Sequence, residues 1–184
     1  MDERIRSITE DLSQVAADAR AMFGHLSPEQ LNWKPAKDSW SVAQCFEHII
    51  RTNLQFYPEF EKMAAGTRQN SFWENWSPLS GWGGRFLINA VTIDSKKAKA
   101  PSKDIVPPSD VDADIIDRFA KHIEDVNRMV EACESADRQK TVVTSPFLAV
   151  FTYRLDDAFT VLVEHTRRHF RQAARVAGAD GFPG

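Results

Sequence analysis

The chain has 184 residues, of which 42% are hydrophobic, and its formal net charge is −3. This length and apolar fraction predict a single domain, residues 1–184, that is large enough to bury a substantial core. The slight acidic excess argues against nucleic acid or a membrane surface as a partner, because surfaces that bind either are usually basic. No apolar run reaches membrane-spanning length, the charged N-terminus lacks a signal peptide's apolar segment, and there are only two cysteines. We therefore expect a cytoplasmic protein.

The first half of the chain predicts two long helices. Apolar residues recur every three or four positions over residues 2–26, and two prolines then interrupt the pattern. A second helix is predicted from residue 39 or 40 to about residue 65, with Asp38 or Ser39 as its N-cap. Pro58 lies inside this segment and either kinks the helix or marks its early end. The apolar stripe of this helix consists of Val42, Phe46, Ile49, Asn53, Phe56 and Phe60.

The second half predicts two more long helices. One begins after Ser109 or Asp110, either of which can cap it, and continues to about residue 135. The other covers residues 152–177 and is ended by Gly178. No segment alternates clearly enough to predict a sheet. Four long amphipathic helices predict an all-α protein, a four-helix bundle.

The connection between the second and third helices is long and rich in tryptophan. It covers residues 66–108 and contains Trp73, Trp76 and Trp82. A connection of this length in a compact domain is usually functional or has structure of its own. The three indoles favour a hydrophobic plug over the bundle end or a dimer surface, and the alternative is an aromatic wall beside a pocket.

Two of the five histidines, His165 and His169, lie four positions apart in the last predicted helix. This spacing places them on the same face, one turn apart, and both fall toward the apolar half of the helix. Two imidazoles so placed can converge on one metal ion. The alternative is a pair of buried histidines that are satisfied by hydrogen bonds. The spacing alone favours the hydrogen-bonded pair, and the inward orientation adds weight to the metal, since buried polar nitrogens are costly without a partner.

A further ligand has to come from another helix, and His48 is the candidate. It lies at the edge of the second helix's apolar stripe, beside small side chains that leave room for a cavity. Cys45, one of these, is either a soft ligand or a small core residue. His25 and His122 have no histidine partner at helical spacing, and we interpret them as structural or surface residues.

Three imidazoles suit zinc, nickel or iron. Three protein ligands also leave a coordination position open, which is the arrangement of catalytic rather than structural zinc sites. Glu47 and Glu164 are neighbours of the histidines in sequence, but adjacent residues of a helix point in different directions, so neither is predicted to be a base. The catalytic residues are therefore unknown at this stage.

Two segments resemble the DinB/YfiT-like family. "LSPEQLNWKPAKDSWSVAQCFEHI" is similar to the family's Trp-x-Pro turn, Trp-Ser pair and following histidine, and "FTVLVEHTRRHFRQAARV" is similar to its last helix. The order of the helices fits as well, so the resemblance covers nearly the whole chain. It implies a four-helix bundle of up-down-down-up topology. It also implies a metal site formed by His48, His165 and His169, the three residues that the helical periodicity selects.

The resemblance also bears on function. It implies a metal-dependent enzyme, either a thiol S-transferase that uses a low-molecular-weight thiol or a hydrolase, acting on an unidentified small molecule. The implied cofactor is a divalent metal ion, zinc or nickel first and iron or manganese next. Two other interpretations stay open: a non-catalytic metal- or ligand-binding bundle, and a structural or stress-related protein with a vestigial site. A homodimer is an expectation from the resemblance alone.

Overall fold

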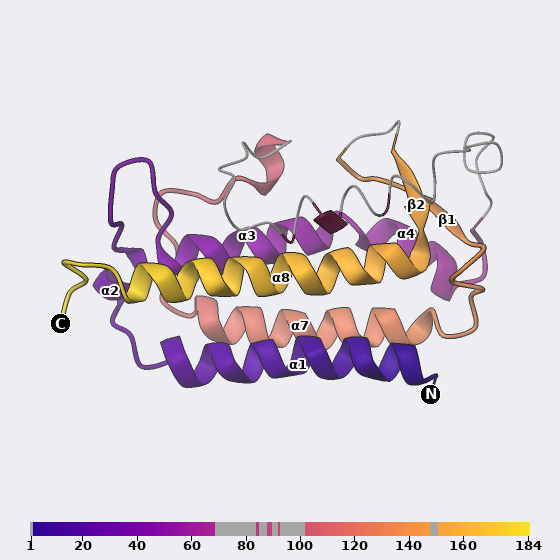
Figure 1. Ribbon diagram of the computed structural model, residues 1–184, viewed down its shortest axis with the longest axis horizontal. Coiled ribbons are helices and arrows are strands. Elements are labelled where there is room, and N and C mark those ends of the chain that lie inside the picture. Colours follow the sequence, from indigo (N-terminus) through magenta and orange to yellow (C-terminus); the bar gives the residue numbers. More distant parts are fainter. Residues whose placement is uncertain (1, 69–83, 85–87, 90–91, 93–101, 148–150) are drawn as a thin grey trace.

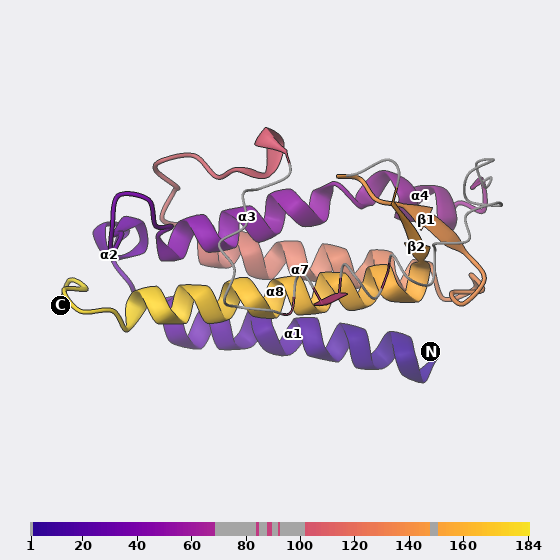
Figure 2. The same ribbon diagram turned by 45° about the horizontal axis from the view of Figure 1, so that its top comes forward.

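The computed structural model describes residues 2–68, 84, 88–89, 92, 102–147 and 151–184, and most of these are helical. Four long helices lie side by side: α1 (Glu3–Phe23), α3 (Val42–Leu54), α7 (Ile115–Ala132) and α8 (Leu155–Ala177). Helices α1 and α3 each pack against both α7 and α8 (Figures 1 and 2). In Figure 1, α1 and α8 run toward the end where the C-terminus lies, and α3 and α7 run the opposite way.

The structure is mostly helical, as predicted, but it also contains a small two-stranded sheet that was not predicted. Strand β1 (Val142–Thr144) pairs antiparallel with β2 (Thr152–Arg154), and Val143 lies opposite Tyr153. Strands of three residues are too short for a period of two to be recognised in the sequence. Because residues 152–154 belong to the sheet, α8 begins at Leu155 and not at residue 152.

The second predicted helix is divided into two. Helix α3 begins at Val42, so the predicted caps Asp38 and Ser39 were wrong. Its N-cap is Ser41, whose Oγ accepts from the Gln44 amide at 3.1 Å, and the Gln44 Oε1 accepts from the Ser41 amide at 3.2 Å. This reciprocal capping box satisfies two backbone donors at the start of the helix. The next helix is α4 (Tyr57–Ala64), with Pro58 in its first turn, where a missing amide hydrogen is harmless.

The third long helix starts later than predicted. Helix α7 begins at Ile115, and neither Ser109 nor Asp110 caps it. The preceding chain is held elsewhere, because the Val111 backbone is hydrogen-bonded to the side chain of Asn32. Asn32 ends a short helix that was not predicted, α2 (Pro28–Asn32). A 3-10 turn, η1 (Lys103–Ile105), lies upstream of α7.

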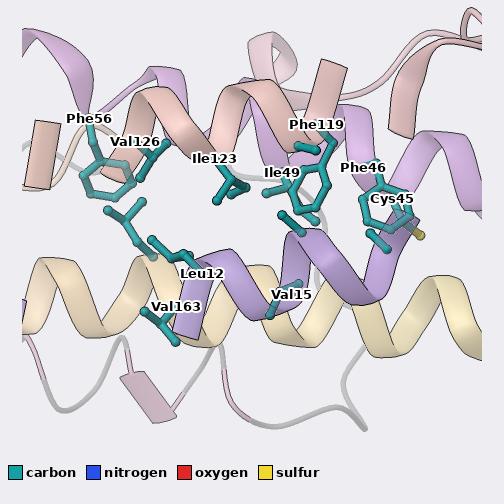
Figure 3. Close-up of a cluster of buried hydrophobic side chains, with 14 of the residues drawn as sticks. Leu12, Val15, Cys45, Phe46, Ile49, Phe56, Phe119, Ile123, Val126 and Val163 are labelled. Carbon is teal, nitrogen blue, oxygen red and sulfur yellow. The ribbon is translucent and has the colours of Figure 1, made fainter. Parts of the chain in front are cut away.

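Apolar side chains of the long helices form one core cluster (Figure 3). Phe46 of α3 is central to it, with ring centroids 4.8 Å from Phe119 and 5.4 Å from Phe23. The predicted apolar stripe of the second helix, Asn53 included, is buried. A core of this extent supplies a driving force for folding that needs no bound ligand.

Two further predictions concern the tryptophan-rich connection and the expected lack of a membrane-spanning segment. The tryptophan-rich stretch with Trp73, Trp76 and Trp82 lies outside the described residues, so both of its interpretations stay predictions. Within the described part of the chain, no helix combines the length and the apolar character needed to cross a membrane.

Candidate metal centre

The packing of α3 against α8 brings three histidines together. His48 comes from α3, and His165 and His169 come from successive turns of α8. One ring nitrogen of each lies within 4.8 Å of those of the other two, a spacing that allows a common metal ion. The Nε2 atoms of His48 and His165 are 3.3 Å apart. Within the described ranges, no further histidine, cysteine or carboxylate joins this group.

The outward nitrogen of His48 is held by the backbone. Its Nδ1 lies 2.7 Å from the carbonyl oxygen of Ile105, just upstream of α7. A carbonyl oxygen only accepts, so His48 Nδ1 carries the hydrogen and Nε2 presents its lone pair to the other two histidines. Metal-binding histidines typically have this arrangement, in which the second nitrogen donates to a carbonyl or carboxylate.

His169 is held in a similar way by a side chain. Its Nδ1 lies 3.0 Å from Oε1 of Gln172, three residues along the same helix. The amide oxygen accepts the Nδ1 hydrogen, so the remaining lone pair of His169 is on Nε2. Gln172 lies in the segment that resembles the family's last helix, but no role was predicted for it. Its spacing of three is the signal that indicates this contact.

The ring of His165 completes a triangle with the other two, with its centroid 4.5 Å from that of His169 and 5.1 Å from that of His48. Its Nδ1 is buried and has no hydrogen-bond partner among the described residues. Its side chain as a whole is half-buried, and His48 and His169 are buried. The inward orientation that the helical periodicity predicted for the pair on α8 is therefore what the structure has.

Burial keeps the imidazoles of His48 and His165 neutral. It lowers the pKa of His48 to about 4, against the opposing effect of the hydrogen bond to Ile105, and the charge of Arg168 lowers it further. Burial also holds the pKa of His165 well below its usual value, and His169, His48 and Arg168 act in the same direction. Neutral imidazole is the form that binds metal, so the donor set fits a divalent ion.

Trp40 packs against two of the three histidines, His48 and His169. Its ring centroid lies 4.7 Å from that of His48 and 5.7 Å from that of His169. The half-buried indole is placed there because Ser41, the next residue, is the N-cap of α3. This contact was not predicted, because helical periodicity cannot place a residue that precedes the helix.

Cys45 is not part of the group. Its thiol is buried, and burial raises its pKa to about 12, so it stays protonated at neutral pH. Figure 3 shows Cys45 beside Phe46 in the core cluster. Of its two predicted roles, that of a small core residue fits this position.

The two carboxylates next to the histidines in sequence are paired with arginines. Glu47 lies 2.7 Å from Arg51 and 3.3 Å from Arg118. Glu164 lies 3.1 Å from Arg167. Neither belongs to the group of converging ligand atoms.

The other two histidines lie apart from the site. His25 is exposed. His122 is buried and stacks on Tyr57, with an interplanar angle of 7° and the Tyr57 hydroxyl 3.3 Å from its Nδ1. Neither belongs to the converging group, which agrees with their interpretation as surface and structural residues.

Comparison with known proteins gives the family. Neither the curated proteins nor the solved structures contain a match to this chain. The family model described as the DinB superfamily matches residues 11–173, which is most of the chain. The match includes the whole of α3 and the three converging histidines. The chain belongs to the DinB superfamily.

Proposed function

We propose that His48, His165 and His169 bind one divalent metal ion through their Nε2 atoms, and that the protein is a metal-dependent enzyme. The observation that carries this proposal is a pair of hydrogen bonds on the side of the rings away from the cluster. His48 Nδ1 bonds to the Ile105 carbonyl and His169 Nδ1 bonds to the Gln172 side chain. These contacts leave lone pairs on the inward nitrogens of a buried cluster. Membership of the DinB superfamily supports the same conclusion.

A hydrogen bond between two of the imidazoles is the alternative to a metal. His165 Nε2 would then donate to His48 Nε2 across the 3.3 Å that separates them. That single hydrogen is the most that the three inward nitrogens can share, because His48 and His169 carry theirs on Nδ1. A divalent cation instead accepts a lone pair from each of the three rings, so the metal accounts for the arrangement better.

The chemistry of the donors narrows the choice of metal. Three neutral imidazoles suit zinc and nickel, which we propose first, ahead of iron and manganese. When bound, such an ion supplies Lewis acidity that activates a water or a thiol near neutral pH. Three protein ligands leave room for that group or for a substrate.

The chain's own residues define the surroundings of the reaction. The indole of Trp40 packs against His48 and His169 and offers an apolar surface to a small-molecule substrate. The Thr52 hydroxyl lies 3.5 Å from His48 Nε2, close enough to bond a polar group held at the site. We propose a thiol S-transferase that uses a low-molecular-weight thiol, or a hydrolase, as the reaction class.

A non-catalytic metal- or ligand-binding bundle is the second candidate. One observation favours it: Glu47 and Glu164, the carboxylates nearest in sequence, are both paired with arginines. Neither is available as a general base in this arrangement. A structural or stress-related protein with a vestigial site would show the same pairing but would bind no metal.

We extend the proposal to the architecture. Residues 1–184 are proposed to form one domain with the up-down-down-up topology of a four-helix bundle. The opposed directions of the pairs α1 and α8, and α3 and α7, support this topology (Figure 1). A homodimer stays a prediction, which light scattering on the purified protein tests.

An activity screen tests the proposed reaction. Protein loaded with zinc or nickel is assayed against electrophilic substrates with a panel of low-molecular-weight thiols, and against esters and amides without thiol. The control is His169→Ala, treated identically. Thiol-dependent turnover that the control lacks supports the transferase, and thiol-independent hydrolysis that it lacks supports the hydrolase. Metal binding without turnover supports the second candidate, and equal activity in the control contradicts the site.

A further inference from the structure

The segment that precedes α7 lies along α3 and is called the strap, residues 102–111. Figure 2 shows it in pink, passing from η1 along α3 toward α2. Burial alternates along the strap. Ile105 and Pro107 are buried, whereas Val106 and Pro108 are exposed. The exposed fraction of Ile105 is only 2%, so an apolar side chain anchors the strap.

The strap is also held by polar side chains of one face of α3. Positions 44, 48 and 51 are spaced by four and three residues, which places them in one row along the helix. Each donates to a backbone carbonyl of the strap: Gln44 Nε2 to Pro108 at 2.7 Å, His48 Nδ1 to Ile105 at 2.7 Å, and Arg51 Nη1 to Val106 at 3.4 Å.

The downstream end of the strap is fastened to α2. The Asn32 side chain donates from Nδ2 to the Val111 carbonyl at 2.9 Å and accepts at Oδ1 from the Val111 amide at 3.0 Å. One amide therefore satisfies both backbone groups of a residue 79 positions away. This pair of bonds fixes where the strap leaves the surface of α3.

His48 belongs to the strap contacts and to the histidine cluster at once. Its Nδ1 bonds to the strap, and its Nε2 lies 3.3 Å from His165. A docked strap selects the tautomer with the hydrogen on Nδ1 and fixes the plane of the ring. Without the Ile105 carbonyl, the ring can rotate and can carry its hydrogen on Nε2, the form that cannot bind metal through that atom.

We propose that docking of the strap and metal binding at the three histidines are coupled, with Gln44 and Asn32 as positioning residues that act on His48 through the strap. This inference rests on the proposed metal site. Coupling between two equilibria is reciprocal, so a bound metal must stabilise the docked strap to the same degree that the docked strap improves metal affinity. The side-chain amides of Gln44 and Asn32 bond to the backbone of the strap, so these residues act on the metal through the strap.

Gln44→Glu separates the two tasks of Gln44. Its Oε1 caps α3 and its Nε2 holds the strap. Glutamate keeps the capping oxygen, a normal part of a capping box, and removes the donor to Pro108. The added negative charge would by itself attract a cation. If Gln44→Glu binds zinc more weakly, the charge is therefore not the cause. Asn32→Ala is a second variant, which removes the hydrogen bonds between α2 and the strap without adding a charge.

Gln30→Glu is the matched control. Gln30 occupies the same position in the capping box of α2, where its Oε1 accepts from the Ser27 amide at 2.8 Å. Its Nε2 also donates to a backbone carbonyl, that of Pro183, at 3.0 Å. Pro183 is no part of the strap. The substitution therefore makes the same chemical change without touching the strap.

The experiment measures zinc affinity by competition with a chromophoric chelator, and hydrogen exchange of backbone amides in residues 102–111 with and without zinc. We expect Gln44→Glu and Asn32→Ala to weaken zinc binding by about tenfold, the lower end of the range for residues that orient a ligand. Both should speed exchange in the strap, and zinc should slow it in the unsubstituted protein. Gln30→Glu should change neither.

Three results would overturn the inference, and they differ in what they refute. Equal zinc affinity in all four proteins, with zinc still bound, refutes the coupling and leaves the metal site intact. No zinc binding by the unsubstituted protein refutes the proposed function, and the coupling falls with it. Unchanged strap exchange on addition of zinc also contradicts the coupling, because reciprocity requires the effect.

Discussion

The Nε2 atoms of His48 and His165 lie 3.3 Å apart, although the two residues are 117 positions apart in the chain. They belong to α3 and α8, so an ion bound between them would join two helices that pack against each other. The hydrophobic core lies alongside and holds the helices without any ion. Metal binding should thus add to a fold that already exists.

Zinc should raise the melting temperature of metal-free protein without changing its helix content. At a free zinc concentration 100-fold above the dissociation constant, mass action stabilises the folded state by about 2.7 kcal/mol. For a chain of this size, that corresponds to a shift of about 5–10 °C. Circular dichroism melts after chelation, with and without added zinc, measure it. His48→Ala should show no shift, and an equal shift in this variant would contradict the site.

Gln172→Leu should weaken metal binding by about tenfold or more. Leucine is of similar size but cannot accept the hydrogen of His169 Nδ1, which Gln172 Oε1 accepts at 3.0 Å. Gln172→Glu is the matched control, because a carboxylate oxygen still accepts that hydrogen. Isothermal titration with zinc compares the three proteins. If the leucine variant bound zinc as tightly as the glutamate variant, Gln172 would have no part in orienting His169.

His122 should make the protein sensitive to acid. Burial lowers its pKa to about 4, and the nearby charge of Asp125 opposes this only in part. Between pH 6.5 and about pH 4, the unfolded chain binds a proton at this residue that the folded chain does not. Stability therefore falls as the pH falls through this window, by about 3 kcal/mol in total from this residue.

His122→Phe tests this acid sensitivity. Phenylalanine keeps a ring to stack on Tyr57 but cannot be protonated. Urea denaturation at a series of pH values between 4 and 7 gives the slope of the unfolding free energy against pH. The slope of the unfolding free energy against pH should be shallower in the variant, by an amount that corresponds to at most one bound proton. His48 and His165 have lowered pKa values too, so only the difference between the two proteins is informative. Identical slopes would refute the assignment.

The sequence predicted the parts of the molecule that depend on helical periodicity. Apolar spacing located the four long helices and turned His165 and His169 inward, because residues four positions apart share a face. It also selected His48, since that residue lies at the edge of an apolar stripe. Packing of that stripe against α8 then brings all three together. Local apolar spacing was thus enough to identify the three histidines that converge.

Features that depend on contacts between distant segments could not be predicted in this way. The Ile105 carbonyl that orients His48 is 57 positions away, and no local pattern relates the two. The late start of α7 has the same origin, because Asn32 of α2 holds Val111. The break between α3 and α4 was indicated by Pro58, but the sequence left a kink and a break equally open.

Metal content per chain is the most direct test of the account. His48→Ala, His169→Ala, His25→Ala and His122→Ala are purified beside the unsubstituted protein, loaded with zinc, desalted and analysed by elemental mass spectrometry. We expect about one ion per chain in the unsubstituted protein, His25→Ala and His122→Ala, and far less in His48→Ala and His169→Ala. All five should remain helical. Equal metal content in all five proteins would contradict the three-histidine site and the function proposed for it.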